Sequence, residues 1–236
     1  MPADQRLALV TGANRGLGLV VACGLARQGV HVLLGSRCLE RGHAAAARHQ
    51  DAGWMQPVQL DVTDDWSIAA LAALIRREYG RLDLLVNNAG VHAARDPGLT
   101  LREAFEDSFS VNLLGVALVT AAMAPLLARS AAGRVVNVAD RTASPDQHAA
   151  APGAGCAMYL ASKAALDALT LSQAQALAPQ GIAVNAVCPG PVATAGAAWA
   201  TRRSAAEGAA VVLRQALPDL PDPRQTFTAA GEKRPW

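Results

Sequence analysis

The fold is decided by LVTGANRGLG, residues 9–18, where an apolar run passes through three glycines into a helical pattern. Residues 7–10 are typical of a buried parallel strand, and residues 17–28 have the apolar spacing of a helix. Glycine lets such a corner turn tightly and lets backbone N–H groups approach a pyrophosphate, which the positive end of the following helix attracts. Although glycine-rich turns also occur in α/β proteins without a nucleotide, this stretch predicts a dinucleotide site.

The rest of the chain alternates strand and helix patterns, with no internal repeat and no linker. This alternation predicts an α/β fold, a Rossmann-type doubly wound parallel sheet of about seven strands with helices on both faces, in a single domain over residues 1–236. Ligands bind such a sheet at the carboxyl ends of its strands, so residues just after strands are the candidates for a site. The expected strands are residues 7–10, 30–35, 54–62, 82–87, 134–138, 182–187 and 225–228, and the expected helices are residues 17–28, 39–50, 64–79, 100–110, 111–128, 158–178 and 204–217.

Composition and charge exclude several classes of protein. Hydrophobic residues make up 52% and charged residues 17% of the 236 residues, which is typical of a globular chain that buries a core and not of a disordered one. The formal net charge is +2, and the basic residues are spread along the chain. This pattern argues against a nucleic-acid partner or an anionic membrane surface, and leaves a small-molecule substrate as the expected partner.

Targeting, membrane and metal signals are not recognised in the sequence. The first six residues lack the charged-then-apolar pattern of a signal peptide. The longest apolar stretch, residues 113–128, is short for a bilayer and contains Pro125, so we expect a buried or subunit-facing helix there. The four cysteines have no metal-ligand spacing. We therefore expect reduced cysteines, no metal site and a cytoplasmic protein.

The residues after the second expected strand bear on the type of nicotinamide cofactor. An enzyme that uses NAD usually carries an acid about 20 residues beyond the glycine turn, where it binds the ribose 2′-hydroxyl. Here the sequence reads Gly35-Ser36-Arg37, with no acid. Arg37 and Arg15 could each contact a 2′-phosphate, which favours NADPH over NADH unless both are ordinary surface arginines.

Tyr159 and Lys163 form a candidate proton-transfer pair in the expected helix 158–178. Residues four apart share one face of a helix, so both side chains would project toward the carboxyl edge of the sheet. A phenol ordinarily has a pKa of about 10, and a neighbouring ammonium favours the phenolate. The spacing therefore predicts a tyrosine whose pKa is brought nearer to the range where it can exchange a proton.

Together these features resemble the short-chain dehydrogenase/reductase family. The glycine turn has the family's GxxxGxG spacing, residues 87–90 read NNAG, and residues 159–163 match its YxxxK motif. Residues 189–194 read PGPVAT, which is similar to the family's PGxVxT loop. The resemblance covers essentially the whole chain, and the C-terminal part is similar to the carbonyl-reductase-like branch.

The resemblance implies NADPH (or NADP⁺) as the cofactor. Asp61 and Val62 match the family's pair that touches the adenine; Thr63 or Asp64 is the more natural cap of the next helix, which leaves Asp61 for this task. Small residues in NNAG let the backbone pass under the adenosine, while an asparagine side chain can join the strand ends. The implied cofactor-binding residues are Gly12, Asn14, Arg15, Gly16, Leu17, Gly18, Arg37, Asp61, Val62, Asn88, Ala89, Gly90, Tyr159, Lys163, Pro189, Gly190, Val192 and Thr194.

The resemblance also implies catalytic roles. Tyr159 would protonate a carbonyl oxygen while NADPH delivers hydride, and Lys163 would assist Tyr159 and bind the nicotinamide ribose. Asn112 resembles the family's catalytic asparagine, which bends its helix, holds a water and extends a proton relay to the lysine. A buried asparagine that satisfies backbone groups is the competing structural explanation for Asn112.

The chain departs from the family after the fifth strand, where a serine pair is normal and Ala139-Asp140 stands here. If the register holds, Asp140 replaces the catalytic serine, yet an ionised carboxylate cannot donate to the substrate oxygen and repels its developing charge. Asp140 could be held protonated near Tyr159, or it could favour a cationic substrate such as an iminium carbon. Alternatively, Thr142 or Ser144 could take the place of the serine, although both lie far along the chain for that position.

The sequence thus predicts an NADPH-dependent reductase that acts on a C=O or C=N bond of a small molecule. Two alternatives stay open because of Asp140: a non-redox enzyme such as a cyclase or isomerase, and a non-catalytic NADPH-binding sensor. The intact Tyr159 and Lys163 speak against loss of activity.

The family resemblance further implies a homodimer or homotetramer, in which helices near residues 113–128 and 158–178 pack across a two-fold axis. His92 and His148 lie in loops that would line the substrate pocket. Either could contact substrate, but exposed loop histidines are the expectation.

Overall fold

The computed structural model describes residues 5–92, 98–140, 154–190, 192, 203–217, 227–229 and 232–234. The strands are β1 Leu7–Val10, β2 His31–Ser36, β3 Met55–Gln59, β4 Leu84–Asn87, β5 Arg134–Val138, β6 Ala183–Cys188, β7 Phe227–Ala229 and β8 Glu232–Arg234. The helices are α1 Gly16–Arg27, α2 Leu39–Ala47, α3 Asp65–Glu78, α4 Leu101–Phe109, α5 Gly115–Leu127, α6 Ala154–Leu177 and α7 Ala205–Ala216. Short turns of 3₁₀ helix (η1 Gln50–Ala52, η6 Ala178–Gln180) and of π-helix (η3 Ser110–Leu114) are also present.

The strands form one eight-stranded sheet in the order β3-β2-β1-β4-β5-β6-β7-β8. Strands β1 to β7 are parallel to one another, and β8 pairs antiparallel with β7. The predicted doubly wound parallel sheet with helices on both faces is therefore confirmed. The sequence patterns do not predict β8, because its residues Glu232, Lys233 and Arg234 lack the apolar alternation of a strand.

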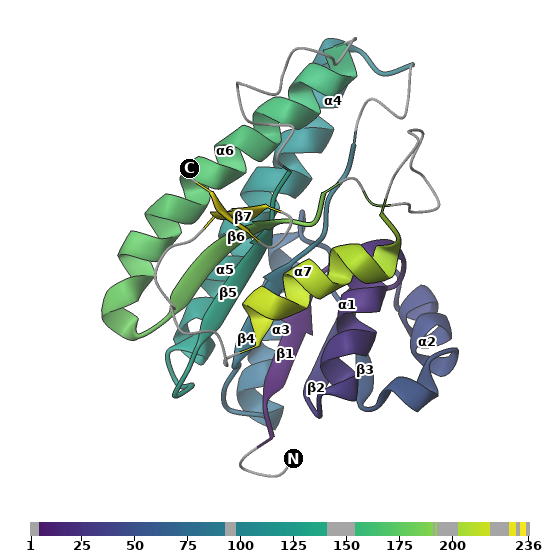
Figure 1. Cartoon of the computed structure of the whole chain (residues 1–236), viewed down its shortest axis with the longest axis vertical. Coiled ribbons are helices and arrows are strands. Elements are labelled where there is room, and N and C mark those ends of the chain that lie inside the picture. Colours follow the sequence, from purple (N-terminus) through teal and green to yellow (C-terminus); the bar gives the residue numbers. More distant parts are fainter. Residues whose placement is uncertain are drawn as a thin grey trace.

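The alternation of side chains along the strands separates two apolar cores. In β1, Leu7 and Leu9 belong to a cluster with α3, α5 and α6, whereas Ala8 and Val10 belong to a cluster with α1, α2 and α7. Figure 1 shows α1 and α7 on the near face of the sheet and α3 and α5 on the far face. Because both faces of the central strands are buried, these strands read in the sequence as continuous apolar runs.

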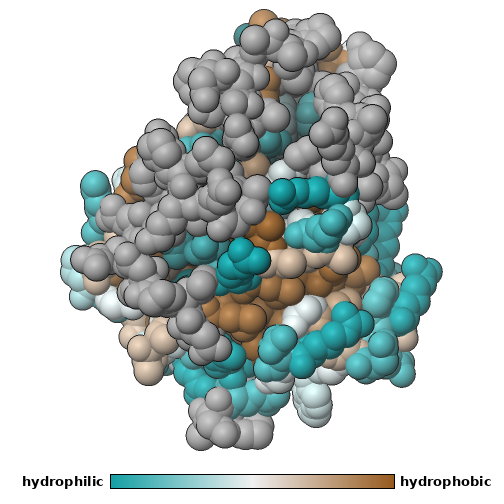
Figure 2. Space-filling view, in the orientation of Figure 1, coloured by the Kyte–Doolittle hydropathy of each residue, from teal (hydrophilic) through white to brown (hydrophobic). Residues whose placement is uncertain are grey.

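The near face of the molecule is largely apolar around α7, with hydrophilic side chains around that area (Figure 2). Helix α7 begins with a capping box. The Glu207 N–H donates to Ser204 Oγ, and the Ser204 N–H donates to the Glu207 carboxylate. Helix α7 packs against α1. The helix thus closes the near face over the middle of the sheet.

Helices α4 and α5 join through the π-helical turn η3 into one long run. We predicted two helices that meet at residues 110 and 111, and the structure places the wider π turn at this joint. By length and composition, this run, Leu101–Leu127, is long and apolar enough to cross a membrane, and 44% of its most apolar window is buried. Val119, Met123 and Leu126 of α5 are buried in the core on the far face of the sheet.

Strand β3 ends at Gln59, which is shorter than the predicted strand at residues 54–62. The chain turns because Asp61 Oδ1 accepts hydrogen bonds from the N–H and the hydroxyl of Thr63, at 2.9 and 2.7 Å. Asp64 then caps α3 by accepting a hydrogen bond from the Trp66 N–H, as the sequence suggested. These local bonds replace the continued strand.

A buried polar network crosses the sheet on the side of α5 and α6. Asn87 of β4 donates to Thr120 of α5 and to Asn137 of β5, at 3.0 and 2.8 Å. Asn137 in turn donates to Thr170 and Gln173 of α6, at 2.9 and 3.1 Å. The two asparagines are direct partners in the register of β4 and β5.

Candidate active site

The glycine turn between β1 and α1 is tight because other backbone passes close to it. Gly12 and Gly16 have left-handed φ values of +63° and +58°. A Cβ added to Gly12 would lie 2.9 Å from the Cα of Ala89, and one added to Gly18 would overlap the Asn88 amide. Only glycine therefore fits these two positions without a shift of the chain.

The ends of β1 and β4 are held together beneath this turn. Thr11 Oγ1 accepts hydrogen bonds from the backbone N–H groups of Asn88 and Ala89, at 3.0 and 2.9 Å. The Asn88 side chain donates back to the Thr11 carbonyl at 2.9 Å. The NNAG segment thus joins the strand ends and leaves a floor of small residues beside the glycine turn.

Helix α1 begins without a side-chain cap. Arg15 occupies its N-cap position without a capping hydrogen bond, and no acid lies in its first turn. Helix α2 also lacks a side-chain cap but has the acid Glu40 in its first turn, whereas α3, α4 and α7 are each capped by the side chain of the preceding residue. The N–H groups and positive dipole end at Gly16 to Gly18 therefore fit the pyrophosphate of a dinucleotide.

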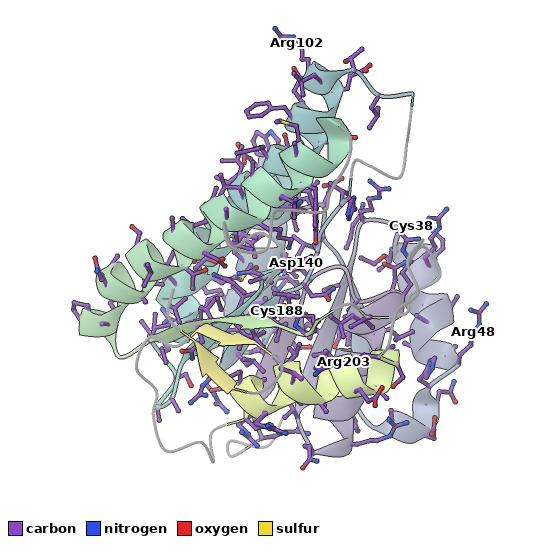
Figure 3. The ribbon with its side chains drawn as sticks, turned by 45° about the horizontal axis from the view of Figure 1, so that its top comes forward. Cys38, Arg48, Arg102, Asp140, Cys188 and Arg203 are labelled. Atoms are coloured by element: carbon purple, nitrogen blue, oxygen red, sulfur yellow. The ribbon has the colours of Figure 1, made fainter. Side chains whose placement is uncertain are left out.

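The candidate catalytic groups meet at the carboxyl ends of β5 and β6. Figure 3 shows Asp140 and Cys188 near the middle of the fold, at the ends of these neighbouring strands. The Tyr159 hydroxyl of α6 donates to Asp140 Oδ2 at 2.7 Å. The register that we predicted for Asp140 therefore places its carboxylate directly beside the tyrosine.

Lys163 lies one turn further along α6 and is 6% exposed. Its Nζ donates to the carbonyl of Val138, the last residue of β5, at 2.9 Å. Burial lowers the pKa of the Lys163 ammonium, and the charges of Asp140, Asp167 and Cys188 act against this shift. The ammonium is thus buried at the strand ends beside acidic side chains.

Asn112 lies in the π-helical turn η3 and is fully buried. Its side-chain oxygen accepts from the Val91 N–H and its amide donates to the Val91 carbonyl, both at 2.9 Å. The amide also donates to Ser162 Oγ at 3.0 Å. Asn112 therefore satisfies backbone groups, as the structural explanation required, and also faces Gly90, where an added Cβ would lie 3.3 Å from Asn112 Oδ1 and 3.8 Å from Lys163 Nζ.

A model of the short chain dehydrogenase family matches residues 6–206. The chain belongs to the short-chain dehydrogenase/reductase family. Among its relatives is the short-chain dehydrogenase anuI of Penicillium roqueforti, 33% identical over 226 residues that cover 91% of this chain and 90% of the relative.

Solved structures resemble this short-chain dehydrogenase over nearly its whole length. Salutaridine reductase from Papaver somniferum has a TM-score of 0.82 at 29% identity, covering 94% of this chain and 99% of that one. A gluconate 5-dehydrogenase from Burkholderia cenocepacia, solved in complex with NADP and tartrate, has a TM-score of 0.80 at 28% identity, covering 97% and 95%.

The structure describes some of the remaining residues that we predict to bind the cofactor of this short-chain dehydrogenase. Arg15 and Arg37 are exposed at the carboxyl edge of the sheet. Asp61 Oδ1 accepts two hydrogen bonds from Thr63, while the capping of α3 falls to Asp64, so the predicted adenine contact of Asp61 stays a prediction. Gly190 has a φ of +75°, and Arg203 donates to the Pro189 carbonyl at 3.4 Å. The positions of the remaining loop predictions, Thr194, Thr142, Ser144 and His148, lie outside the described residues.

Sequence reasoning missed Asp167 altogether, and it named His92 only as a pocket-loop histidine without predicting its contact. The His92 ring stacks on the Tyr159 ring, with centroids 3.9 Å apart and planes 14° from parallel. Asp167 follows Lys163 by one helical turn, and burial raises the pKa of its carboxyl to about 7. The spacing of residues 159, 163 and 167 could have revealed Asp167, since all three share one helix face. No sequence signal pairs residue 92 with residue 159.

A cavity of about 410 Å³ lies at the opposite, amino edge of the sheet. Arg81, Arg129 and Arg134 line it and donate to the carbonyls of Gln5, Gly80 and Gln215. These arginines thus join chain ends and helix C-termini, where cations are favoured.

No cluster of three His, Cys, Asp or Glu side chains that could hold a metal occurs among the described residues.

Proposed function

We propose that this short-chain dehydrogenase is an NADPH-dependent reductase that acts on a C=O or C=N bond of a small-molecule substrate. The observation that carries the proposal is the position of Tyr159. Its hydroxyl lies at the end of β5 with Lys163 one turn behind it, at the sheet edge where the uncapped α1 begins. A proton donor and an anion-binding helix end on one edge are the parts that a dinucleotide-dependent reductase requires.

The residues at this edge fit NADPH. The glycine turn and the N-terminus of α1 would hold the pyrophosphate, and Ala89 and Gly90 would underlie the adenosine and ribose. Exposed Arg15 and Arg37 would bind the 2′-phosphate. The residue directly after β2 is Arg37 and not an acid, which supports this role. When bound, the cofactor supplies a hydride.

Within the chain, Tyr159 provides the proton. Its hydroxyl now donates to Asp140, so it must turn this proton toward the oxygen of a carbonyl or the nitrogen of a neutral imine during the reaction, whereas a cationic iminium requires only the hydride. The Lys163 ammonium favours the phenolate that remains, and its bond to the Val138 carbonyl fixes the ammonium in place. Asn112 anchors Val91. It thereby fixes the chain just after Ala89 and Gly90, the small residues that would underlie the cofactor.

Asp140 would select the substrate in one of two ways. If it carries a proton itself, the 2.7 Å contact with Tyr159 becomes a pair of donors to a carbonyl oxygen. If it is ionised, it attracts a cationic C=N carbon and repels a developing oxyanion. Replacing Asp140 by serine tests both: a shift from imine to ketone substrates supports the second, whereas an unchanged preference and pH profile argues against both.

The first experiment measures NADPH consumption with a panel of ketones, aldehydes and cyclic imines, for the wild type and for Tyr159→Phe. Turnover that Tyr159→Phe abolishes supports the reductase. Tight NADPH binding without turnover favours the sensor, and conversion of substrate without NADPH consumption favours the non-redox enzyme.

The cofactor preference is tested by Arg37→Ala and Arg15→Ala, with dissociation constants for NADPH and NADH. Each charge-assisted bond to a phosphate contributes about 1.5 to 3 kcal/mol, so each substitution should weaken NADPH binding by about 10- to 100-fold. NADH binding should change little. Equal losses for both cofactors would contradict a 2′-phosphate contact.

We also propose that residues 1–236 act as one dinucleotide-binding domain in a cytoplasmic homodimer or homotetramer. Leu101, Phe105 and Leu114 on the α4–α5 run are exposed, which supports a subunit contact along these helices and α6. Light scattering of the wild type and of Phe105→Glu tests this, because a charge in the contact should shift the protein toward monomer.

A further inference from the structure

Tyr159 contacts a titratable side chain on each of two sides. Its hydroxyl donates to the Asp140 carboxylate at 2.7 Å. The face of its ring lies against the imidazole of His92, with centroids 3.9 Å apart and planes 14° from parallel. His92 is separated from Tyr159 by 67 residues, so the fold and not the local sequence creates this stack.

The placement of His92 is set by the strand end that carries it. Asn112 holds the N–H and the carbonyl of Val91, the residue directly before His92, in two hydrogen bonds of 2.9 Å. The chain leaves the NNAG floor at Gly90 and reaches His92 two residues later. The imidazole is therefore attached to a backbone that Asn112 holds in place. The position of His92 is thus determined by the fold of the site.

The Asp140 carboxylate creates an electrostatic problem that His92 can offset. A proton donor must become an anion when its proton leaves, and a carboxylate 2.7 Å away disfavours a phenolate. Lys163 opposes this effect, but it is buried and donates to the Val138 carbonyl. A cation stacked on the phenol ring acts on the phenolate directly, because the ring face attracts positive charge.

We propose that His92 is a positioning residue of this site: it holds the Tyr159 ring, and its imidazolium form offsets the Asp140 carboxylate so that Tyr159 can release its proton. The effect on turnover rests on the proposed reductase function, whereas the coupling between His92 and Asp140 does not. Imidazole ordinarily titrates near pH 6.5, so turnover should decline as the pH rises through that range.

Other titratable groups of the site are separate from this effect. Among the described residues they are Asp140 at the end of β5, Lys163 and Asp167 on α6, and Cys188 at the end of β6. Asp167 titrates at about pH 7, in the same range as the imidazole. The test must therefore include a variant that lacks this carboxyl.

The first arm of the test needs no substrate. Nuclear magnetic resonance follows the titration of the histidine rings in the wild type, in His92→Phe to assign the His92 signal among five histidines, and in Asp140→Asn. Loss of the carboxylate should lower the pKa of His92, because an opposite charge nearby favours the imidazolium. An unchanged His92 titration in Asp140→Asn overturns the proposal, whether or not the protein is a reductase.

The second arm measures kcat against pH with any substrate that is turned over. The wild type should lose about tenfold in kcat between about pH 6 and pH 8. His92→Phe keeps an aromatic ring on Tyr159 but no charge, and it should abolish this decline, as should Asp140→Asn. The decline should persist in Asp167→Asn. A decline that persists in His92→Phe, or that disappears in Asp167→Asn, overturns the proposed role in turnover.

Discussion

Replacing Asp167 by asparagine should remove a loss of stability that the wild-type protein suffers as the pH rises. Asp167 lies one helical turn beyond Lys163, and its Oδ1 is buried without a hydrogen-bond partner. Burial raises the pKa of this carboxyl from 3.8 to about 7, the Lys163 charge opposes the shift, and the Asp140 charge adds to it. The folded protein therefore holds a proton at Asp167 that the unfolded chain has already released.

The magnitude follows from the difference between the two pKa values. One unit corresponds to about 1.4 kcal/mol, so a shift of about three units amounts to about 4 kcal/mol. Because the folded-state pKa is raised, the contribution to the free energy of unfolding is complete below pH 3.8 and is lost as the pH rises to about 7. Asparagine has the same shape and no such titration.

The assay is urea unfolding of the wild type and of Asp167→Asn at several pH values between about 4 and 8. Across this range, the free energy of unfolding of the variant minus that of the wild type should rise by about 4 kcal/mol. The other titrating groups contribute equally to both proteins and cancel in this difference. Asp107→Asn, at an exposed position of α4, controls for the change from carboxyl to amide. A difference between variant and wild type that stays constant with pH would refute the reasoning.

Other substitutions test the geometry of the cofactor edge and the helices around it. Gly12→Ala should weaken NADPH binding and destabilise the fold by more than Gly29→Ala, because both glycines have left-handed φ values but only Gly12 has other backbone 2.9 Å from an added Cβ; equal losses in thermal melts would contradict this. Asn112→Ala should lower the free energy of unfolding by about 2 to 4 kcal/mol, since the N–H and the carbonyl of Val91 lose their partner. A loss in urea titrations below about 1 kcal/mol would mean that these groups find other partners. Ser204→Ala should cost about 1 kcal/mol by removing the cap of α7, and unchanged melting would show that the capping box does not stabilise the fold.

Much of the fold could be predicted from sequence because burial on both faces of the sheet leaves unmistakable apolar runs. The strands of the parallel sheet and the glycine turn at Gly12 and Gly16 follow from such runs and from the conformations that only glycine adopts readily. The placement of Asp140 beside Tyr159 also follows, because the helix face and the strand register fix both. The end of β3 does not, because the bonds of Asp61 to Thr63 turn the chain where apolar residues continue.

The contacts that were missed depend on packing between distant segments. His92 was expected to be an exposed loop histidine, yet its ring stacks on Tyr159, which no pattern near residue 92 could show. Likewise, the raised pKa of Asp167 depends on how deeply α6 is buried and not on the residue type. Spacing tells which residues share a face, but the solvent and charge around them come only from the assembled fold.

The paired asparagines of β4 and β5 have a consequence for how the chain finds this sheet. If β5 docked on β4 one residue out of step, Asn137 would turn its amide to the other face, into apolar side chains, and Asn87 would lose its bond to Asn137. The bonds from Asn137 to Thr170 and Gln173 would break with it, so the misdocked sheet would leave several buried polar groups without partners. The apolar neighbours of these strands are interchangeable in shape and would tolerate such a slip far better. A pair of amides therefore makes one alignment of the central strands far more stable than its neighbours, and the same alignment delivers Asp140 to Tyr159.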